Sequence, residues 1–130
     1  MKRLFPLLAA LLLGGCQHWP DTAVLQGQAY YLQRIALPPT AVLNVTLADV
    51  SMADAPAVAL ARYTGPAGAQ VPIPFELSYD RRQLASGHRY AITARIESAG
   101  KLLWINTQAV PVTLDGNDPQ PLRVKVEPVR

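Results

Sequence analysis

Cys16 has the most distinctive side-chain chemistry in the sequence, because it is the only cysteine among 130 residues. A lone cysteine has no disulfide partner within its own chain. Its thiolate is the best alkylation nucleophile that a side chain offers. The residue type therefore indicates a site that could carry a covalently attached group.

A Ser-His-Asp hydrolytic site would need an imidazole, and the sequence contains only His18 and His88. A Ser-His-Asp set could be drawn from His88, either Ser86 or Ser78, and Asp80. However, the segment from Ser86 to His88 has the composition of a turn, and no nucleophile elbow or Gly-rich oxyanion loop accompanies it. We expect a turn at this point and no catalytic residues in the chain.

No spacing of His, Cys, Asp and Glu residues suits a transition metal. The segment from Asp115 to Asp118 lacks the distal Glu of an EF-hand loop, so we interpret it as a turn, with weak calcium binding as the alternative. We expect no metal and no other cofactor.

The formal charge of +3 includes Lys2 and Arg3, and from Cys16 onward ten basic residues face nine acidic ones, a net charge of +1. No Lys/Arg cluster of the kind that neutralises phosphates remains, which argues against a nucleic-acid partner.

The first fifteen residues have the three parts of a secretory signal. A cationic start, Met1–Arg3, precedes an apolar run from Leu4 to Leu13, and two small residues follow. A membrane span needs about 20 apolar residues, so this run is too short to be a transmembrane helix. We expect a cleaved signal peptide over residues 1–15 and a tether over residues 16–23.

The end of that run, Leu13-Gly14-Gly15-Cys16, resembles the lipobox of bacterial lipoproteins. The resemblance implies a diacylglyceryl thioether on Cys16, cleavage between Gly15 and Cys16, and acylation of the new amino group. Two or more acyl chains hold a protein firmly on a membrane, whereas one binds reversibly. Gln17 stands where an Asp tends to retain such proteins at the inner membrane, so the analogy favours the periplasmic face of the outer membrane. The alternative is an ordinary signal peptide followed by a free thiol.

Beyond the leader, apolar and polar residues alternate with a period of two, which is typical of half-buried strands. The clearest case is residues 89–97, where Tyr90, Ile92, Ala94 and Ile96 alternate with mostly polar residues. Turn signals such as Gly65-Pro66 and Ser98-Ala99-Gly100-Lys101 separate the runs. About seven strands are predicted, at residues 25–34, 41–50, 57–64, 71–79, 89–97, 102–107 and 122–127.

Short strands with this punctuation predict an all-β fold, an antiparallel β-sandwich of immunoglobulin-like or transthyretin-like type over residues 24–130. Residues 57–61 could also be read as helix, but they are few and flanked by Pro56 and Gly65. Pro72 and Pro74 remove amide donors from one side of the fourth run, which predicts an edge strand. The alternative there is a loop, with the strand starting at Phe75.

The strand at residues 102–107 is apolar on both faces, so one face needs a cover. If Leu103 and Ile105 point into the core, then Leu102 and Trp104 point outward. An exposed Trp with an Arg nearby is a common contact for a protein or a sugar ring, so Trp104, Leu102 and Arg95 are the candidate surface contact. The alternative is that proline-rich loops cover Trp104.

Four segments, taken in order, resemble the YbaY-type outer-membrane lipoproteins, whose domain is shared with the YscW-type pilotins of type III secretion. They are Arg34–Pro39, Leu47–Pro56, Val71–Leu77 and Tyr90–Ile96. The resemblance covers roughly residues 25–112. It implies a lipidated protein of the cell envelope without a catalytic residue, since the YscW members escort an outer-membrane secretin ring and the YbaY members are largely uncharacterised.

Together these observations predict a periplasmic lipoprotein, anchored through Cys16, that acts as a binding or chaperone module for an outer-membrane or periplasmic protein. A carbohydrate-binding or hydrolase-inhibiting lipoprotein is the alternative, and it depends on an exposed Trp104.

Overall fold

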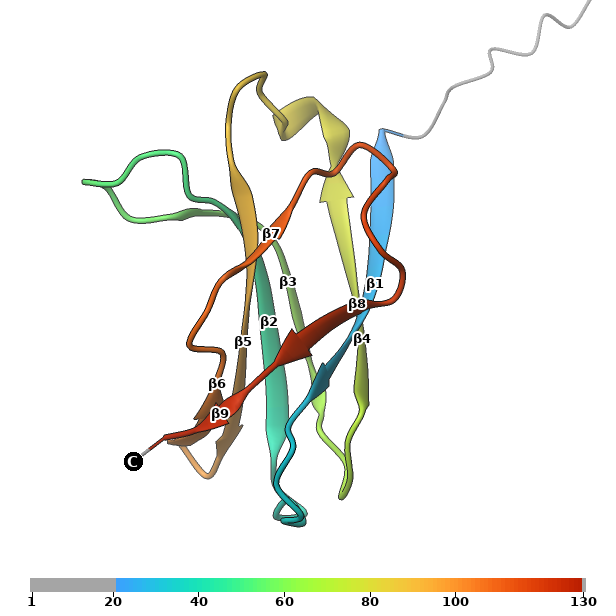
Figure 1. Cartoon of the computed structure of the whole chain (residues 1–130), viewed down its shortest axis with the longest axis vertical. Helices are drawn as coiled ribbons and strands as arrows, with labels where there is room; N and C mark the ends of the chain where they lie inside the picture. The colour runs from blue at the N-terminus through green and yellow to red at the C-terminus, as the bar shows by residue number, and fades with distance from the viewer. Residues whose placement is uncertain (1–20, 130) are drawn as a thin grey trace, which may run out of the picture.

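Two β-sheets pack face to face in the computed structural model, which describes residues 21–129 (Figure 1). One sheet has three strands in the order β4–β1–β8. The other has six, in the order β3–β2–β5–β6–β9 with β7 also paired to β5. The predicted all-β sandwich is therefore confirmed. The elements are β1 Thr22–Tyr30, β2 Val42–Asp49, β3 Val58–Pro66, β4 Ile73–Asp80, the 3₁₀ turn η1 Arg81–Gln83, β5 Tyr90–Ser98, β6 Lys101–Ile105, β7 Val110–Val112, β8 Leu122–Lys125 and β9 Glu127–Pro128.

The alternation of side chains explains why these segments become strands. In β4, Ile73, Phe75, Leu77 and Tyr79 are buried while the residues between them are exposed or half-buried. β1 alternates in the same way, so the three-stranded sheet turns one apolar face toward the other sheet. Burying each large aliphatic side chain contributes about 1.5–3 kcal/mol. The largest fully buried side chains are Leu43, Leu47, Leu77, Ile92, Ile96, Val45, Val124 and Val126.

One pairing departs from the predicted antiparallel arrangement. β8 runs parallel to β1, with Gly27 opposite Leu122 and Tyr30 opposite Lys125. The other strand pairs within residues 21–129 are antiparallel. The chain crosses from β7 in one sheet to β8 in the other through residues 113–121, and so it enters beside β1 in the same direction (Figure 1). Alternation within a segment shows which side chains are buried, but it does not show whether the strand runs parallel or antiparallel to its neighbour. Parallel neighbours can also lie far apart in sequence, so no short turn marks the pair.

The edge strands and the β5–β6 turn follow the sequence closely. β3 covers the segment that could have been a helix, and it pairs with β2. β4 lies at the edge of its sheet, where the missing amide of Pro74 is tolerated, and it begins at Ile73 rather than Phe75. β5 and β6 are joined by Ala99 and Gly100, both at positive φ (51° and 77°). This is the geometry of a tight two-residue hairpin, and it lies at the turn signal that the sequence showed.

The prediction for β6 was wrong about which face is buried. Trp104 is only 4% exposed and Asn106 is 8% exposed, whereas Leu103 and Ile105 are half-buried. A register shift between Ile96 and Glu97 of the neighbouring strand accompanies this orientation. The larger ring therefore fills the core, and Trp104 does not belong to a surface contact.

Asn106 explains how β5 changes partner, from β6 along residues 95–98 to β7 along residues 90–92. Its side-chain oxygen accepts a hydrogen bond from the amide of Ala94 at 2.9 Å. Its side-chain nitrogen donates to the carbonyls of Ile92 at 3.1 Å and Gln108 at 3.0 Å. The buried side chain thus takes the place of a strand where the ladder is interrupted.

The strands define two ends of the sandwich. The start of β1, the ends of β2 and β4 and the start of β5 lie at the same end of the sandwich (Figure 1), and we call this the N-terminal end. The loops that follow β1 and β3 lie at the opposite, distal end (Figure 1). These two loops are joined there, since Leu37 donates to the carbonyl of Ala69 and Ala67 to that of Ala41. The described part of the chain holds no helix with the length and apolar character needed to cross a membrane.

Candidate interaction surfaces

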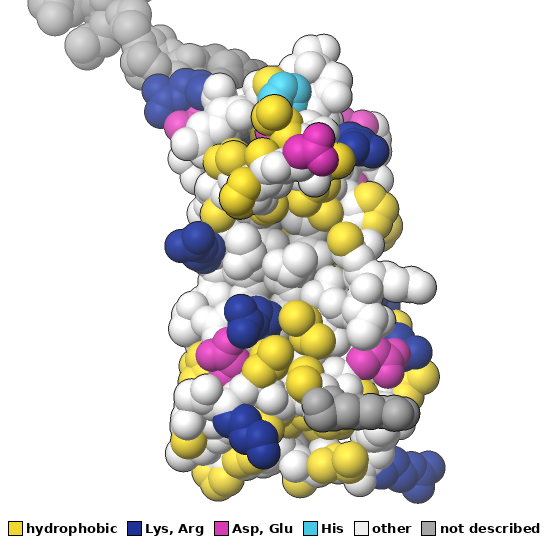
Figure 2. Space-filling view, turned by 90° about the vertical axis from the view of Figure 1, so that its left-hand side faces the viewer, with side chains coloured by type: hydrophobic (Ala, Val, Ile, Leu, Met, Phe, Trp, Pro, Cys, Tyr) yellow, Lys and Arg dark blue, Asp and Glu magenta, His cyan; other side chains and the backbone are white. Residues whose placement is uncertain are grey.

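Large apolar side chains are exposed at both ends of the sandwich. Met52 (71% exposed) and Val58 (63%) lie at the N-terminal end, and Leu32 (69%) and Ile35 (56%) lie at the distal end. Figure 2 shows hydrophobic side chains gathered at the N-terminal end around the cyan histidine. Exposed apolar patches of this kind mark contact surfaces for proteins, membranes or ligands.

The loop between β2 and β3, residues 50–57, carries the first of these patches. It projects sideways from the sandwich (Figure 1), and its sequence from Val50 to Ala57 contains a single charged residue, Asp54. From Met52 to Ala59 every residue is exposed, although most are apolar. The loop therefore presents apolar side chains that the protein itself does not bury.

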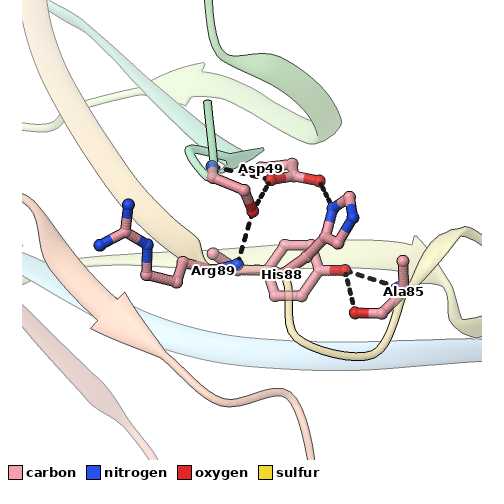
Figure 3. Close-up of polar contacts among 6 residues, drawn as sticks. Asp49, Ala85, His88 and Arg89 are labelled. Carbon is pink, nitrogen blue, oxygen red and sulfur yellow. Dashed lines mark hydrogen bonds and ion pairs between the residues drawn. The ribbon is translucent and has the colours of Figure 1, made fainter. Parts of the chain in front are cut away.

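A group of polar contacts fixes the root of this loop (Figure 3). The carboxylate of Asp49 lies 2.5 Å from Nδ1 of His88 and accepts a hydrogen bond from the Ser51 hydroxyl at 2.5 Å. The Ser51 hydroxyl in turn accepts from the amide of Arg89 at 2.7 Å. The amide of Val50 donates to the carbonyl of Arg89 at 2.8 Å. The first residues of the loop are thus tied to the chain that enters β5.

These hydrogen bonds lower the pKa of Asp49 to about 2, first through His88 and then through the hydroxyl and amide of Ser51. The Ser-His-Asp set that the sequence allowed, with His88 beside Asp80, is not assembled by these contacts. His88 bonds to Asp49, while Asp80 accepts from the amide and guanidinium of Arg82. The predicted turn before His88 is present, closed by the His88 amide on the carbonyl of Ala85 at 3.2 Å.

The distal end contains a cleft of about 400 Å³ beside the exposed Leu32 and Ile35. We call it the distal cleft, and its lining residues are Tyr31, Gln33, Arg34, Ile35, Ala36, Gln70 and Val71. Apolar surface from Ile35 and Val71 is combined with one cation, Arg34. Among residues 21–129, no carboxylate forms an ion pair with Arg34. The cleft can therefore receive an apolar group and an anionic one together.

Trp104 supports this cleft from the core. Its indole stacks on the ring of Tyr31, with centroids 4.0 Å apart and planes 14° apart. Burial raises the pKa of the Tyr31 hydroxyl, which donates its hydrogen bond to the carbonyl of Ile35. One aromatic pair thus connects the core to the loop that carries the exposed apolar side chains.

The remaining predicted surface residues lie together on the outer face of the larger sheet. Arg95 is exposed and its guanidinium contacts the Glu97 carboxylate at 3.1 Å, and Leu102 is half-buried opposite Glu97. Without Trp104 they provide little exposed apolar area. The predicted signal peptide and the lipid site, Leu13, Gly14, Gly15 and Cys16, lie outside the described residues.

The acidic segment after β7 forms a hydrogen-bonded loop. Asp118 accepts from the amides of Thr113 and Leu114, both at 2.8 Å, and Asp115 accepts from the amide of Asn117 at 2.9 Å. These contacts agree with the predicted turn. Residues 21–129 contain no group of three or more His, Cys, Asp or Glu side chains that could hold a metal ion.

The sequence predicted a loop between the strands at residues 41–50 and 57–64, but neither this loop nor the distal cleft was predicted as a contact surface. The loop had a signal, since residues 50–57 combine apolar side chains with Pro56 and lack the alternation of a strand. The distal cleft had no such signal, because Leu32 was assigned to a predicted strand over residues 25–34 that in the structure ends at Tyr30.

Residues 20–124 match the protein family described as type III secretion system lipoprotein chaperone (YscW). Over 93 residues, 71% of this chain and 49% of the relative, the sequence is 38% identical to the uncharacterized lipoprotein YbaY of Escherichia coli (strain K12). The chain thus spans about half the length of this curated relative. The fold resembles an alternative pilotin from the type II secretion system of Vibrio cholerae, with a TM-score of 0.77 and 39% identity over 84% of this chain and 98% of that one.

Proposed function

Because the chain belongs to the YscW family of lipoprotein chaperones, we propose that it is a lipid-anchored, non-catalytic binding protein that escorts a protein of the cell envelope. In this proposal residues 1–15 are removed, Cys16 carries the lipid, and residues 16–23 tether the domain of residues 24–130. The anchored protein then stands on the periplasmic face of the outer membrane. Its partner is an outer-membrane or periplasmic protein, such as a secretion component of the kind that pilotins serve.

The distal cleft is the observation that supports binding best. Its lining residues belong to the loops that follow β1 and β3, at the end of the sandwich opposite the start of β1 and so away from the anchored end (Figure 1). It combines Ile35, beside the exposed Leu32, with the cation of Arg34, which pairs with no carboxylate among residues 21–129. A partner segment with apolar side chains and a nearby carboxylate would fit this chemistry, because the planar guanidinium of an Arg can bind a carboxylate through two parallel hydrogen bonds.

A second function, carbohydrate binding, lost its main support when Trp104 was found in the core. A sugar ring is usually held on an exposed aromatic face, and Trp104 uses its face for Tyr31.

Affinity capture of the acylated protein from envelope extracts tests the proposal. We expect Leu32→Asp and Ile35→Asp to reduce the yield of the co-purifying envelope protein by about tenfold, since each puts a charge where the bound partner would cover an apolar side chain. Val24→Asp makes the same kind of change on a valine that is 44% exposed on β1, and it should leave the yield unchanged. Equal capture by all three variants would exclude the distal cleft as the binding surface.

The anchor is tested separately by the mass of the mature protein. We expect the wild type to begin at Cys16 and to carry the added acyl groups. In the Cys16→Ala variant the added mass should disappear and residues 1–15 should remain. A mature wild type with an unmodified thiol would contradict anchoring through Cys16.

A further inference from the structure

We propose that the β2–β3 loop is a second membrane contact, whose apolar side chains enter the interfacial layer of the bilayer beside the lipid anchor. The inference rests on the proposed attachment at Cys16, because it takes the membrane to lie at the N-terminal end. It adds to that function an orientation of the domain, with the distal cleft facing away from the lipid.

The length of the tether keeps the N-terminal end close to the membrane. Five residues separate Cys16 from Thr22, the first residue of β1. Even fully extended, six residue steps reach only about 20 Å, roughly the thickness of a two-sheet sandwich with its side chains. Asp49 at the root of the loop and Asp80 opposite Thr22 lie at this same end. The loop is therefore among the parts of the domain that the tether holds nearest to the bilayer.

The side chains of the loop suit an interfacial position. Met52 and Val58 are the most exposed large apolar residues at this end, and the alanines and Pro56 between them are exposed as well. Insertion of such side chains to the depth of the headgroup and acyl boundary is favourable in proportion to the apolar area removed from water. The polar contacts of Asp49, Ser51 and His88 hold the root of the loop (Figure 3), and the rest of the loop projects from the sandwich (Figure 1).

The charges around the loop exclude attraction to anionic headgroups as the driving force. Six carboxylates at the N-terminal end outnumber three guanidinium groups, and several form ion pairs or hydrogen bonds with one another. The carboxylates are those of Asp21, Asp49, Asp54, Asp80, Asp115 and Asp118, and the guanidinium groups are those of Arg81, Arg82 and Arg89. The contact should therefore be apolar, independent of anionic lipid and insensitive to salt.

The chain allows a direct test, because its only native cysteine is the proposed lipid site. Met52→Cys, Val58→Cys and, as a matched distal control, Leu32→Cys each introduce one free thiol for an environment-sensitive fluorophore. Each labelled, acylated protein is reconstituted into phosphatidylcholine vesicles with brominated acyl chains, with or without phosphatidylglycerol. The mass of each sample reports acylation of Cys16, so that failure of the anchor is distinguished from failure of the loop.

We expect bromine quenching and blue-shifted emission for labels at positions 52 and 58 but not at 32, in both kinds of vesicle and at high salt. Adding Met52→Asp to the Val58→Cys protein should reduce the inserted population by about tenfold. In acylated protein, equal quenching at positions 52 and 32 would overturn the inference. Absence of quenching at both would do so as well, and quenching that requires phosphatidylglycerol would assign the contact to headgroup charge instead.

Discussion

At the distal end an aromatic stack supports the exposed apolar side chains, whereas at the N-terminal end hydrogen bonds to carboxylates hold them in place. Tyr31 reaches the distal loop from its contact with buried Trp104. The β2–β3 loop depends on Asp49, whose partners Ser51 and His88 lie near the surface. The first support is part of the hydrophobic core and contributes to global stability. The second is local and depends on the charge of one carboxylate.

The largest effect should come from breaking the distal support with Trp104→Ala. Removing a buried Trp leaves a cavity and should lower the free energy of unfolding by about 3–5 kcal/mol, measured by urea denaturation. Hydrogen exchange of the Leu37 amide, which bonds to Ala69, should accelerate more than that of Val50. Trp104→Phe keeps an aromatic face and should lose less. A loss below about 1 kcal/mol would contradict a structural role for the indole.

The second largest effect on stability should come from Asn106, which lies between the two ends, where the partner of β5 changes from β6 to β7. Asn106→Ala leaves the amide of Ala94 and the carbonyl of Ile92 without their partner, and each orphaned buried group costs about 1–3 kcal/mol. We expect a loss of at least about 2 kcal/mol in urea denaturation. Asn44→Ala is the matched control, because its bond to Thr64 is exposed and should be worth under about 0.5 kcal/mol. Similar losses in the two variants would show that burial of the amide has no special effect.

A smaller effect, of opposite sign, is expected in the hairpin between β5 and β6. Ala99 is held at a φ of 51°, a left-handed conformation that Asn tolerates better than Ala. Ala99→Asn should therefore raise the free energy of unfolding by about 0.5–1 kcal/mol. Ala99→Val, with a branched side chain at the same φ, should lower it. If both variants shifted the thermal midpoint in the same direction, the turn geometry would not explain the change.

The comparison of the two ends also shows what the sequence could reveal. The strands were predictable because alternation and turn residues are local signals, and seven segments coincide with strands. The buried face of β6 was not predictable, because Leu103 and Trp104 are both apolar. Only the packing of Trp104 against Tyr31 determines which of the two side chains enters the core. β7, from Val110 to Val112, is too short to show a period.

Both candidate surfaces were harder to predict than the strands, for a related reason. The β2–β3 loop becomes a surface because β2 and β5 bring Asp49 next to His88, 39 residues away in the chain. The distal cleft needs the loops after β1 and β3 to meet. Contacts between distant segments leave no periodic signal in either segment. The turn before His88 was predictable, whereas its partner Asp49 was not.

The smallest expected effect is also the most specific one. Lowering the pH should loosen the N-terminal end and leave the distal end unchanged. The pKa of Asp49 is about 2, below its ordinary value of 3.8, because the carboxylate accepts hydrogen bonds from His88 and Ser51. A lowered pKa stabilises the folded state above the ordinary value, and this contribution is lost as the pH falls from about 4 to about 2. Because these groups lie near the surface, where solvent screens their charges, the effect should stay small and local.

Amide exchange followed by NMR between pH 5 and pH 2 gives the measurement, after correction for the intrinsic pH dependence of exchange. Protection of the Ser51 amide, which donates to Asp49 at 3.0 Å, should fall over this range. Protection of the Leu37 amide at the distal end should stay constant, because its partner is a backbone carbonyl and its support is aromatic. Asp49→Asn should remove the pH dependence at Ser51. If both amides lost protection together in the wild type, acid would be acting on the whole domain and the two ends would not be independent.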